Sequence, residues 1–106
     1  MKKSPVRIDP RALQARAGEV ADLLRALSND RRLLILCKLV EEGEATVGSL
    51  ADDVGLSQSA LSQHLARMRD EGIVAFRRDA QTMWYRIADS RIEALLATLH
   101  RLYCRN

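Results

Sequence analysis

Proline is confined to the N-terminal end of this chain. Both prolines, Pro5 and Pro10, lie among the first ten of 106 residues. Because proline interrupts helix interiors and central strands, the long proline-free remainder suits continuous helices. In the first expected helix, apolar residues recur at spacings of three, four and seven, which is typical of a helix with one buried face. The chain is therefore expected to form one mostly helical domain, and its length allows no more than one.

Four helices are expected in the first two thirds of the chain, after a loose basic tail over residues 1–8. Asp9 followed by Pro10 has the form of a helix cap and a first helical residue. Ser28 and Asn29 are alternative caps for the second helix, which is apolar on nearly every side and should be the most buried. The expected segments are 10–27, from Ser28 or Asn29 to Gly43, from Thr46 to Val54, and from Ser57 to Asp70.

Two strands and a helix are expected in the last third. Residues 73–78 and 82–87 read as a hairpin joined by a three-residue turn at 79–81. The pattern Ser90-x-x-Glu93 has the form of a capping box that opens the last helix. One face of that helix carries Ile92, Leu95, Leu96, Leu99 and Tyr103. The expected fold is mostly α with a β-hairpin wing, in the order α-α-α-α-β-β-α over residues 9–106.

Composition restricts the partners and the compartment. Lys and Arg number 17 against 14 Asp and Glu, a net charge of +3 that permits a nucleic-acid partner without proving one. No apolar run approaches the roughly 20 residues that span a bilayer. The charged start of the chain has no apolar segment behind it, so it does not resemble a secretion signal. We expect a cytoplasmic protein that does not associate with membranes.

The stretch from Thr46 to Arg69 is the most informative for function. A short helix, a turn at Gly55 and a second helix match the helix-turn-helix pattern. The second helix carries short or amide-bearing side chains where an ordinary exposed helix carries Glu and Lys. Such side chains suit the major groove of DNA, where Gln pairs with adenine and Arg with guanine or phosphate. The candidate DNA-binding residues here are Ser57, Gln58, Ser59, Ser62, Gln63, His64 and Arg67. The alternative is an ordinary polar surface.

The hairpin supplies a second candidate DNA contact. Arg77, Arg78 and Gln81 surround its turn, and a basic wing tip can follow phosphates or enter the minor groove. The alternative is that both arginines are solvated charges balanced by Asp79. Weaker phosphate candidates are Arg31, Arg32 and Arg86. Trp84 and Tyr85 point to opposite faces of the strand, so one of them should pack on the core.

A single recognition helix reads only a few base pairs. A two-fold dimer reads two half-sites about one helical turn apart, roughly 34–36 Å. The first and last helices have apolar faces without an obvious partner in so small a domain. We expect these faces to pair across a dimer axis, with Leu23 and Leu24 against Ile92, Leu95 and Leu99. The alternative is that these helices pack only on the core of their own chain.

The two cysteines, Cys37 and Cys104, form no C-x-x-C motif, so thioredoxin chemistry and a zinc ribbon are not expected. In a reducing cytoplasm such cysteines are more often small buried hydrophobic residues than a site. No general base, phosphate loop or catalytic triad spacing is present, so an enzyme is not expected. A protein-interaction module remains an alternative to DNA binding, although aromatic residues rather than Gln and Ser favour protein interfaces.

Three segments resemble the ArsR/SmtB winged-helix repressors. They are ALSNDRRLLIL at 26–36, TVGSLA at 46–51 and LSQSALSQHL at 56–65. The resemblance covers about residues 20–105 and is most specific in the third segment. It implies a homodimeric transcriptional regulator that binds double-stranded operator DNA.

The metal sites of that family are incomplete in this chain. The thiol pair of its arsenic and cadmium sensors would fall at residues 45–48, which contain no cysteine. Of the four zinc-ligand positions on the last helix, Asp89 and His100 match, whereas Arg91 and Tyr103 replace the other two. A tetrahedral zinc site is therefore not expected, nor any other metal or cofactor. A metal-responsive repressor that uses Asp89 and His100 remains an alternative.

One cysteine in the second helix and one at the end of the last helix resemble a branch of the family that contains persulfide-responsive repressors, such as the biofilm-growth and sulfide:quinone reductase repressors. This resemblance implies that Cys37 and Cys104 join through a disulfide or polysulfide when reactive sulfur species or oxidants rise, and that DNA then dissociates. A disulfide requires the two Cα atoms within about 7 Å. We expect Cys104, beside Arg101 and Arg105, to react first and Cys37 to complete the bridge.

Overall fold

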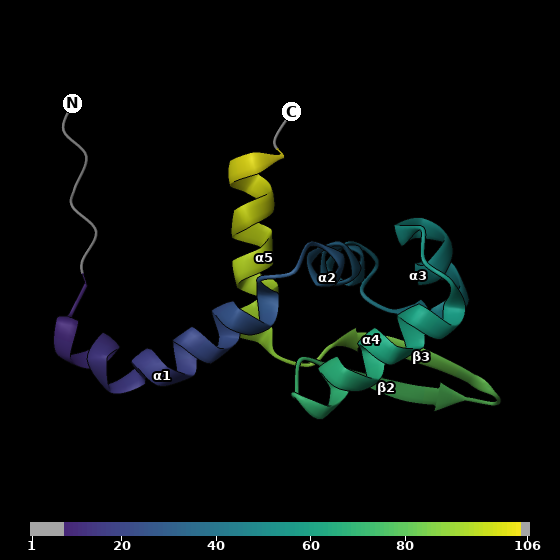
Figure 1. The fold of residues 1–106 in the computed structure, drawn as a ribbon, viewed down its shortest axis with the longest axis horizontal. Coiled ribbons are helices and arrows are strands. Elements are labelled where there is room, and N and C mark those ends of the chain that lie inside the picture. The colour runs from purple at the N-terminus through teal and green to yellow at the C-terminus, as the bar shows by residue number, and fades with distance from the viewer. Residues whose placement is uncertain (1–7, 105–106) are drawn as a thin grey trace.

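Helix α1 extends from the rest of the molecule as an arm, while the other helices gather around a small sheet (Figure 1). The computed structural model describes residues 8–104. The helices are α1 (Pro10–Leu27), α2 (Asp30–Glu42), α3 (Val47–Val54), α4 (Gln58–Asp70) and α5 (Ser90–Tyr103), and the strands are β1 (Ala45–Thr46), β2 (Val74–Asp79) and β3 (Thr82–Ile87). This is the expected mostly helical winged fold with one additional short strand. The expected basic tail, apart from its last residue, lies outside the described residues.

Polar side chains set the start of every helix. The expected caps of the first four helices are confirmed as Asp9, Asn29, Thr46 and Ser57. Asn29 rather than Ser28 caps α2, because its side-chain oxygen accepts hydrogen bonds from the backbone N–H groups of Arg31 and Arg32.

The expected capping box of the last helix is wrong. Ser90 is the first helical residue, and the cap is Asp89, whose carboxylate accepts the backbone N–H of Arg91 at 2.9 Å. Asp89 also forms an ion pair with the Arg91 side chain. A carboxylate at the positive end of the helix makes both interactions, which a serine hydroxyl cannot.

The hairpin differs from expectation in its turn. Asp79 pairs with Thr82, so the turn has two residues, Ala80 and Gln81, rather than three. The φ of Ala80 is 57°, in the left-handed region that matches the twist of tight hairpins. The sheet also contains β1, which pairs with β3 and gives the strand order β1-β3-β2. A two-residue strand is too short to show a period, so the sequence pattern missed it.

The core lies where α2, α3, α4 and α5 meet the sheet. Its fully buried side chains are Ile35, Leu36, Leu39, Leu50, Leu61, Leu65, Met68, Val74, Ile92 and Leu96. Tyr85 is buried against them, whereas the neighbouring Trp84 lies on the other face of the strand, as the alternation predicted. Helix α2 is not buried on every side, because Leu34 is 54% exposed and Cys37 is exposed.

The expected dimer contacts need correction. Ile92 is 1% exposed within its own subunit and cannot also pack on a second one. Leu23 and Leu95 are half-buried against the same core. The large apolar side chains that stay exposed on α1 and α5 are Leu13, Val20, Leu24, Leu102 and Tyr103. The radius of gyration is 16.0 Å, against about 13 Å for a compact chain of this length, as the extended α1 requires.

Arg32 joins three helices at the base of the arm. Its guanidinium donates to the Ala26 carbonyl at 3.0 Å and to both carboxylate oxygens of Glu71, at 2.8 and 3.1 Å. The end of α1, the start of α2 and the end of α4 therefore meet at one side chain, which is only 13% exposed. Arg32 is thus engaged within the protein and is a poor phosphate contact. No helix among residues 8–104 is both long and apolar enough to cross a membrane.

Replacing Arg32 (Arg32→Ala) should lower the free energy of unfolding by about 2 kcal/mol, because hydrogen bonds to charged groups each contribute roughly 1.5–3 kcal/mol and the exposure of Glu71 reduces that value. Urea unfolding measures the loss. The Arg32 guanidinium holds the pKa of Glu71 below its ordinary value. The stabilisation should therefore be complete above the unfolded-state pKa of Glu71 and disappear as the pH falls through the lower folded-state pKa.

The matched control is Arg31→Ala. The Arg31 side chain is exposed and makes no ion pair with any other residue in the described part of the chain. This variant should stay within about 0.5 kcal/mol of the wild type. Equal losses in both variants would show that net charge, rather than the link between Arg32 and Glu71, determines the stability.

Candidate nucleic-acid interface and cysteine pair

Helix α4 presents one polar face to solvent. Leu61, Leu65 and Met68 are fully buried and anchor the opposite face. Gly55, in the left-handed conformation with φ 71° and ψ 36°, ends α3 and turns the chain into α4. The exposed side chains on the outer face are Gln58, Ser59, Ser62, Gln63, Arg67 and, at the end of the helix, Asp70. No carboxylate lies within residues 58–69, and the exposed Asp70 at the C-terminal end of α4 is the acidic side chain of this face.

Two of the predicted DNA-binding residues, Ser57 and His64, are not simply exposed side chains of the outer face. Ser57 is exposed, but its hydroxyl already accepts the backbone N–H of Ala60 at 3.1 Å as the helix cap. His64 is half-buried and borders a cavity of about 730 Å³ between α1, α4 and α5. The outer face and His64 are therefore separate surfaces, although Arg67 borders both.

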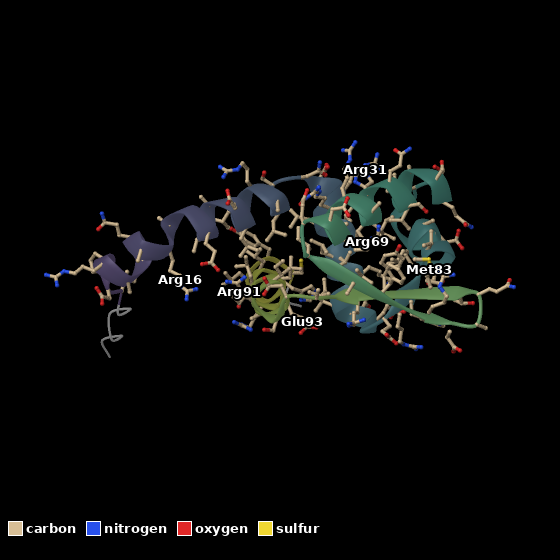
Figure 2. The ribbon with its side chains drawn as sticks, turned by 90° about the horizontal axis from the view of Figure 1, so that it is seen from below. Arg16, Arg31, Arg69, Met83, Arg91 and Glu93 are labelled. Atoms are coloured by element: carbon tan, nitrogen blue, oxygen red, sulfur yellow. The ribbon has the colours of Figure 1, made fainter. Side chains whose placement is uncertain are left out.

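The alternation of the hairpin separates its two tip arginines. Phe76 pairs with Tyr85, and the guanidinium of Arg69 from α4 lies 5.4 Å from the centre of the Phe76 ring, so this face of the hairpin turns toward α4. Figure 2 shows Arg69 and Met83 between α4 and the hairpin. Arg78 pairs with Met83 and shares that face. Arg78 is exposed, as is Gln81 in the turn.

Arg77 lies on the other face of the sheet and is bound there. Its Nε and Nη2 atoms each donate to the Glu44 carboxylate at 2.9 Å, and its guanidinium lies 5.7 Å from the centre of the Trp84 ring. The hydrogen bonds from Arg77 lower the pKa of Glu44, which stays ionised. The sequence pattern could not find this partner, because Glu44 precedes a strand that the pattern missed. Arg86 shares the face of Arg77. Arg31 lies on the side of the molecule that α4 forms (Figure 2).

Both cysteines are exposed and unbridged, so the expectation of small buried hydrophobic residues is wrong. Cys37 lies on α2, and Cys104 follows the last residue of α5, which packs on α2. Partial burial raises the pKa of the Cys37 thiol, and the charge of Cys104 raises it further.

A groove of about 610 Å³ lies beside Cys37, between α2, α5 and the end of α3. We call it the cysteine groove. Its apolar wall consists of Leu34, Val40, Val54, Leu96 and Ala97, and its polar rim of Lys38, Glu41, Asp53 and His100. Cys104 is not part of the groove lining and lies one turn beyond His100, whose carbonyl accepts the Cys104 N–H.

The two family-like zinc positions do not converge. Asp89 caps the start of α5 and is bound by Arg91, whereas His100 lies in the last turns of the same helix. At 1.5 Å per residue these side chains leave the helix about 16 Å apart, too far for one ion. Within residues 8–104 the structure contains no group of three His, Cys, Asp or Glu side chains placed to hold a metal.

Comparison with known proteins gives consistent results. A family model described as "Bacterial regulatory protein, arsR family" matches residues 29–75. The HTH-type transcriptional regulator YgaV of Escherichia coli is 50% identical over 92 residues, which cover 87% of this chain and 93% of that protein. The transcriptional activator HlyU of Vibrio cholerae is 41% identical over 105 residues, which cover 99% of this chain and 94% of its own.

Solved structures share the fold. The structure of the transcriptional repressor BigR from Xylella fastidiosa superposes with a TM-score of 0.84 at 37% identity. The superposition covers 93% of this chain and 100% of that one. The similarity therefore includes the arm, the wing and the last helix as well as the helix-turn-helix.

Replacing Cys104 by serine should lower the pKa of the Cys37 thiol, because the charge of Cys104 is one of the two causes that raise this pKa. The decrease should be partial, since burial of Cys37 remains. The pH dependence of alkylation at Cys37, followed by peptide mass spectrometry, measures it. A Cys104→Asp variant keeps a negative charge there and should keep the pKa high. An unchanged pKa in Cys104→Ser would show that the two thiols do not influence each other.

Proposed function

The chain belongs to the arsR family of bacterial regulatory proteins, and we propose that it is a homodimeric repressor of the cytoplasm that releases operator DNA when Cys37 and Cys104 become linked. The observation that carries the DNA-binding part is the outer face of α4, which is polar, has no carboxylate before Asp70 at its C-terminal end, and is next to the hairpin face that carries Arg78. The arrangement that supports the switch is that Cys37 is exposed on α2 and Cys104 is exposed at the end of α5, which packs on α2.

In this proposal α4 enters the major groove. Gln58 and Gln63 carry the amides that pair with adenine, the small Ser59 and Ser62 allow close approach, and Arg67 binds guanine or phosphate. These side chains have the exposure that such contacts require. Ser57 contributes mainly as the cap of α4, and His64 at most from the edge of the surface, because of its burial.

The hairpin provides the second contact. Arg78 and Gln81 reach phosphates or the minor groove, since both are exposed and Arg78 lies on the hairpin face that turns toward α4. Arg77 supports the wing more than it binds DNA, because Glu44 occupies one edge of its guanidinium. The wing is therefore a stiffened strand pair, and near its tip Arg78 forms no ion pair with any residue from 8 to 104.

A second copy of the chain completes the operator contact. The exposed side chains of Leu13, Val20 and Leu24 on α1, and of Leu102 and Tyr103 on α5, form the apolar surface that a dimer would cover. Arg91 pairs with Glu19 and so ties α1 to the start of α5, which presents the two helices as a unit. Two recognition helices can then reach half-sites roughly 34–36 Å apart.

The proposed switch acts on that spacing. A bond between Cys37 and Cys104 would fix the end of α5 against α2, and thereby change the angle between the dimer helices and the helix-turn-helix. Two half-sites then cannot be engaged together. A coupling of 1–3 kcal/mol, typical of allosteric proteins, lowers operator affinity about 5- to 150-fold. Reactive sulfur species or oxidants are the proposed inducers.

Arg78→Ala should weaken binding to every duplex and reduce the slope of log affinity against log salt by about 1, because one phosphate contact is lost. Gln63→Ala should instead cost about 1–3 kcal/mol on the preferred operator and little on unrelated DNA. Fluorescence anisotropy across a salt series, with an operator selected from random duplexes, measures both.

Arg77→Ala is the matched control for the wing. It removes the same charge from the neighbouring position, but Glu44 already binds the guanidinium of Arg77. Its salt slope should change less than that of Arg78→Ala. If the affinity of the wild type hardly depends on salt, or if the two variants behave alike, the assignment of Arg78 is wrong.

The Cys37→Ser and Cys104→Ser variants should each bind operator as tightly as the wild type in the reduced state and keep it after polysulfide treatment. The wild type should release it. Intact mass before and after treatment distinguishes a disulfide, which removes two hydrogens, from bridges that add sulfur atoms. Equal release in the wild type and both variants would refute the switch, and release by zinc alone would favour the metal-responsive alternative.

A further inference from the structure

The cysteine groove has an apolar wall on three helices. Leu34 of α2, Val54 of α3 and Leu96 with Ala97 of α5 surround the Cys37 side. The Leu34 side chain is 54% exposed, although it borders the core helices. An apolar concavity of about 610 Å³ is within the size range of small-molecule sites. Cys37 also lines this concavity, so a ligand bound there would lie beside a nucleophilic thiol.

The rim of the groove carries more negative than positive charge. Lys38 lies 3.2 Å from a Glu41 oxygen and 3.7 Å from an Asp53 oxygen, so one cation balances two carboxylates. These carboxylates raise the pKa of Lys38, which stays charged. His100 is the other titratable group at the rim. A ligand that carries extra carboxylates would meet repulsion here, whereas an uncharged apolar group would fit.

We propose that the cysteine groove binds the apolar, uncharged organic group of a persulfide, R–S–S–H, and so selects among sulfur donors. This inference rests on the proposed function, because it gives the chemical class of inducer that reaches the two thiols. The organic group R would lie against Leu34, Val54 and Leu96, with its sulfur atoms directed toward Cys37 and, one turn beyond His100, Cys104.

The sulfur chemistry balances without another oxidant. The Cys104 thiolate attacks the outer sulfur of R–S–S–H, the S–S bond breaks, and R–S⁻ leaves with its electron pair. The Cys37 thiolate then attacks Sγ of Cys104 and expels HS⁻. In sum, R–SSH and two protein thiols give one protein disulfide, R–SH and H₂S. The persulfide is reduced and the two cysteines are oxidised.

Filling the groove tests the inference. Ala97→Leu should slow the reaction with benzyl persulfide roughly tenfold. The larger side chain would keep about two methylene-sized groups of the benzyl ring from being buried in the groove. Its reaction with inorganic hydrogen disulfide, which has no organic group, should keep the wild-type rate. Ala94→Leu is the matched control, because Ala94 is exposed on the same helix and does not line the groove. Rates are measured by intact mass over time.

The wild type should also react faster with benzyl persulfide than with glutathione persulfide, whose organic group carries carboxylates. Equal rates with both donors, or equal slowing of all donors by Ala97→Leu, would overturn the inference while leaving the thiol switch intact.

A non-covalent experiment separates this inference from the proposed function. In the Cys37→Ser/Cys104→Ser double variant no sulfur chemistry is possible, so binding of unreactive benzyl methyl sulfide reports the groove alone. Backbone NMR shifts should change at Leu34, Val54, Leu96 and Ala97 and not on the outer face of α4. If benzyl methyl sulfide binds the groove but the wild type forms no bridge between Cys37 and Cys104, only the switch is refuted. The absence of any shift would refute the groove.

Discussion

The burial of one face of α2 is the constraint on which the rest of the structure depends. Ile35, Leu36 and Leu39 are completely buried where α2 meets α3, α5 and β3. Because this helix packs on all of them, the sheet, the helix-turn-helix and the last helix share one core. The opposite side of α2 remains free for other uses, and it is there that Cys37 borders the cysteine groove. The sensing candidate is thus located on the reverse of the helix that organises the fold.

The same division between anchored and free faces recurs in the candidate DNA-binding surface. Three buried side chains hold α4, which leaves its other face to amides, hydroxyls, the Arg67 guanidinium and, at its end, Asp70. On the hairpin, alternation gives Arg77 to one face and Arg78 to the other, and Glu44 engages only the first. Local periodicity therefore divides residues between structure and function, since each side chain can serve only the side on which its backbone position places it.

Ion pairs at the surface connect elements that share little apolar contact. Arg32 fixes the base of α1 to the ends of α2 and α4, and Arg91 links α1 to the start of α5 through Glu19. The Arg91 pair is exposed and pairs of that kind contribute little stability individually, whereas Arg32 is largely buried. Their value here lies in orientation, because the arm extends from the core and few other interactions define its direction.

The sequence by itself determined most of the local structure. The expected residue types cap four helices, at Asp9, Asn29, Thr46 and Ser57. The buried stripe of α4 follows from its period, and strand β3 has the expected bounds. These features depend on neighbours within one or two turns, so a linear pattern contains them. The cap of α5 was misplaced by one residue, because Asp89 and Ser90 are both good caps and only the side chain of Arg91 distinguishes them.

Only the tertiary structure decided which residues far apart in the chain act together. It assigned Arg32 to Glu71 and Arg77 to Glu44, removed Ile92 from the subunit surface, turned His64 away from the outer face of α4 and brought Cys104 within electrostatic range of Cys37. The physical reason is that such pairs arise from the packing of whole helices on a common core. Their partners are 33 to 67 positions apart, and no spacing rule extends over that distance.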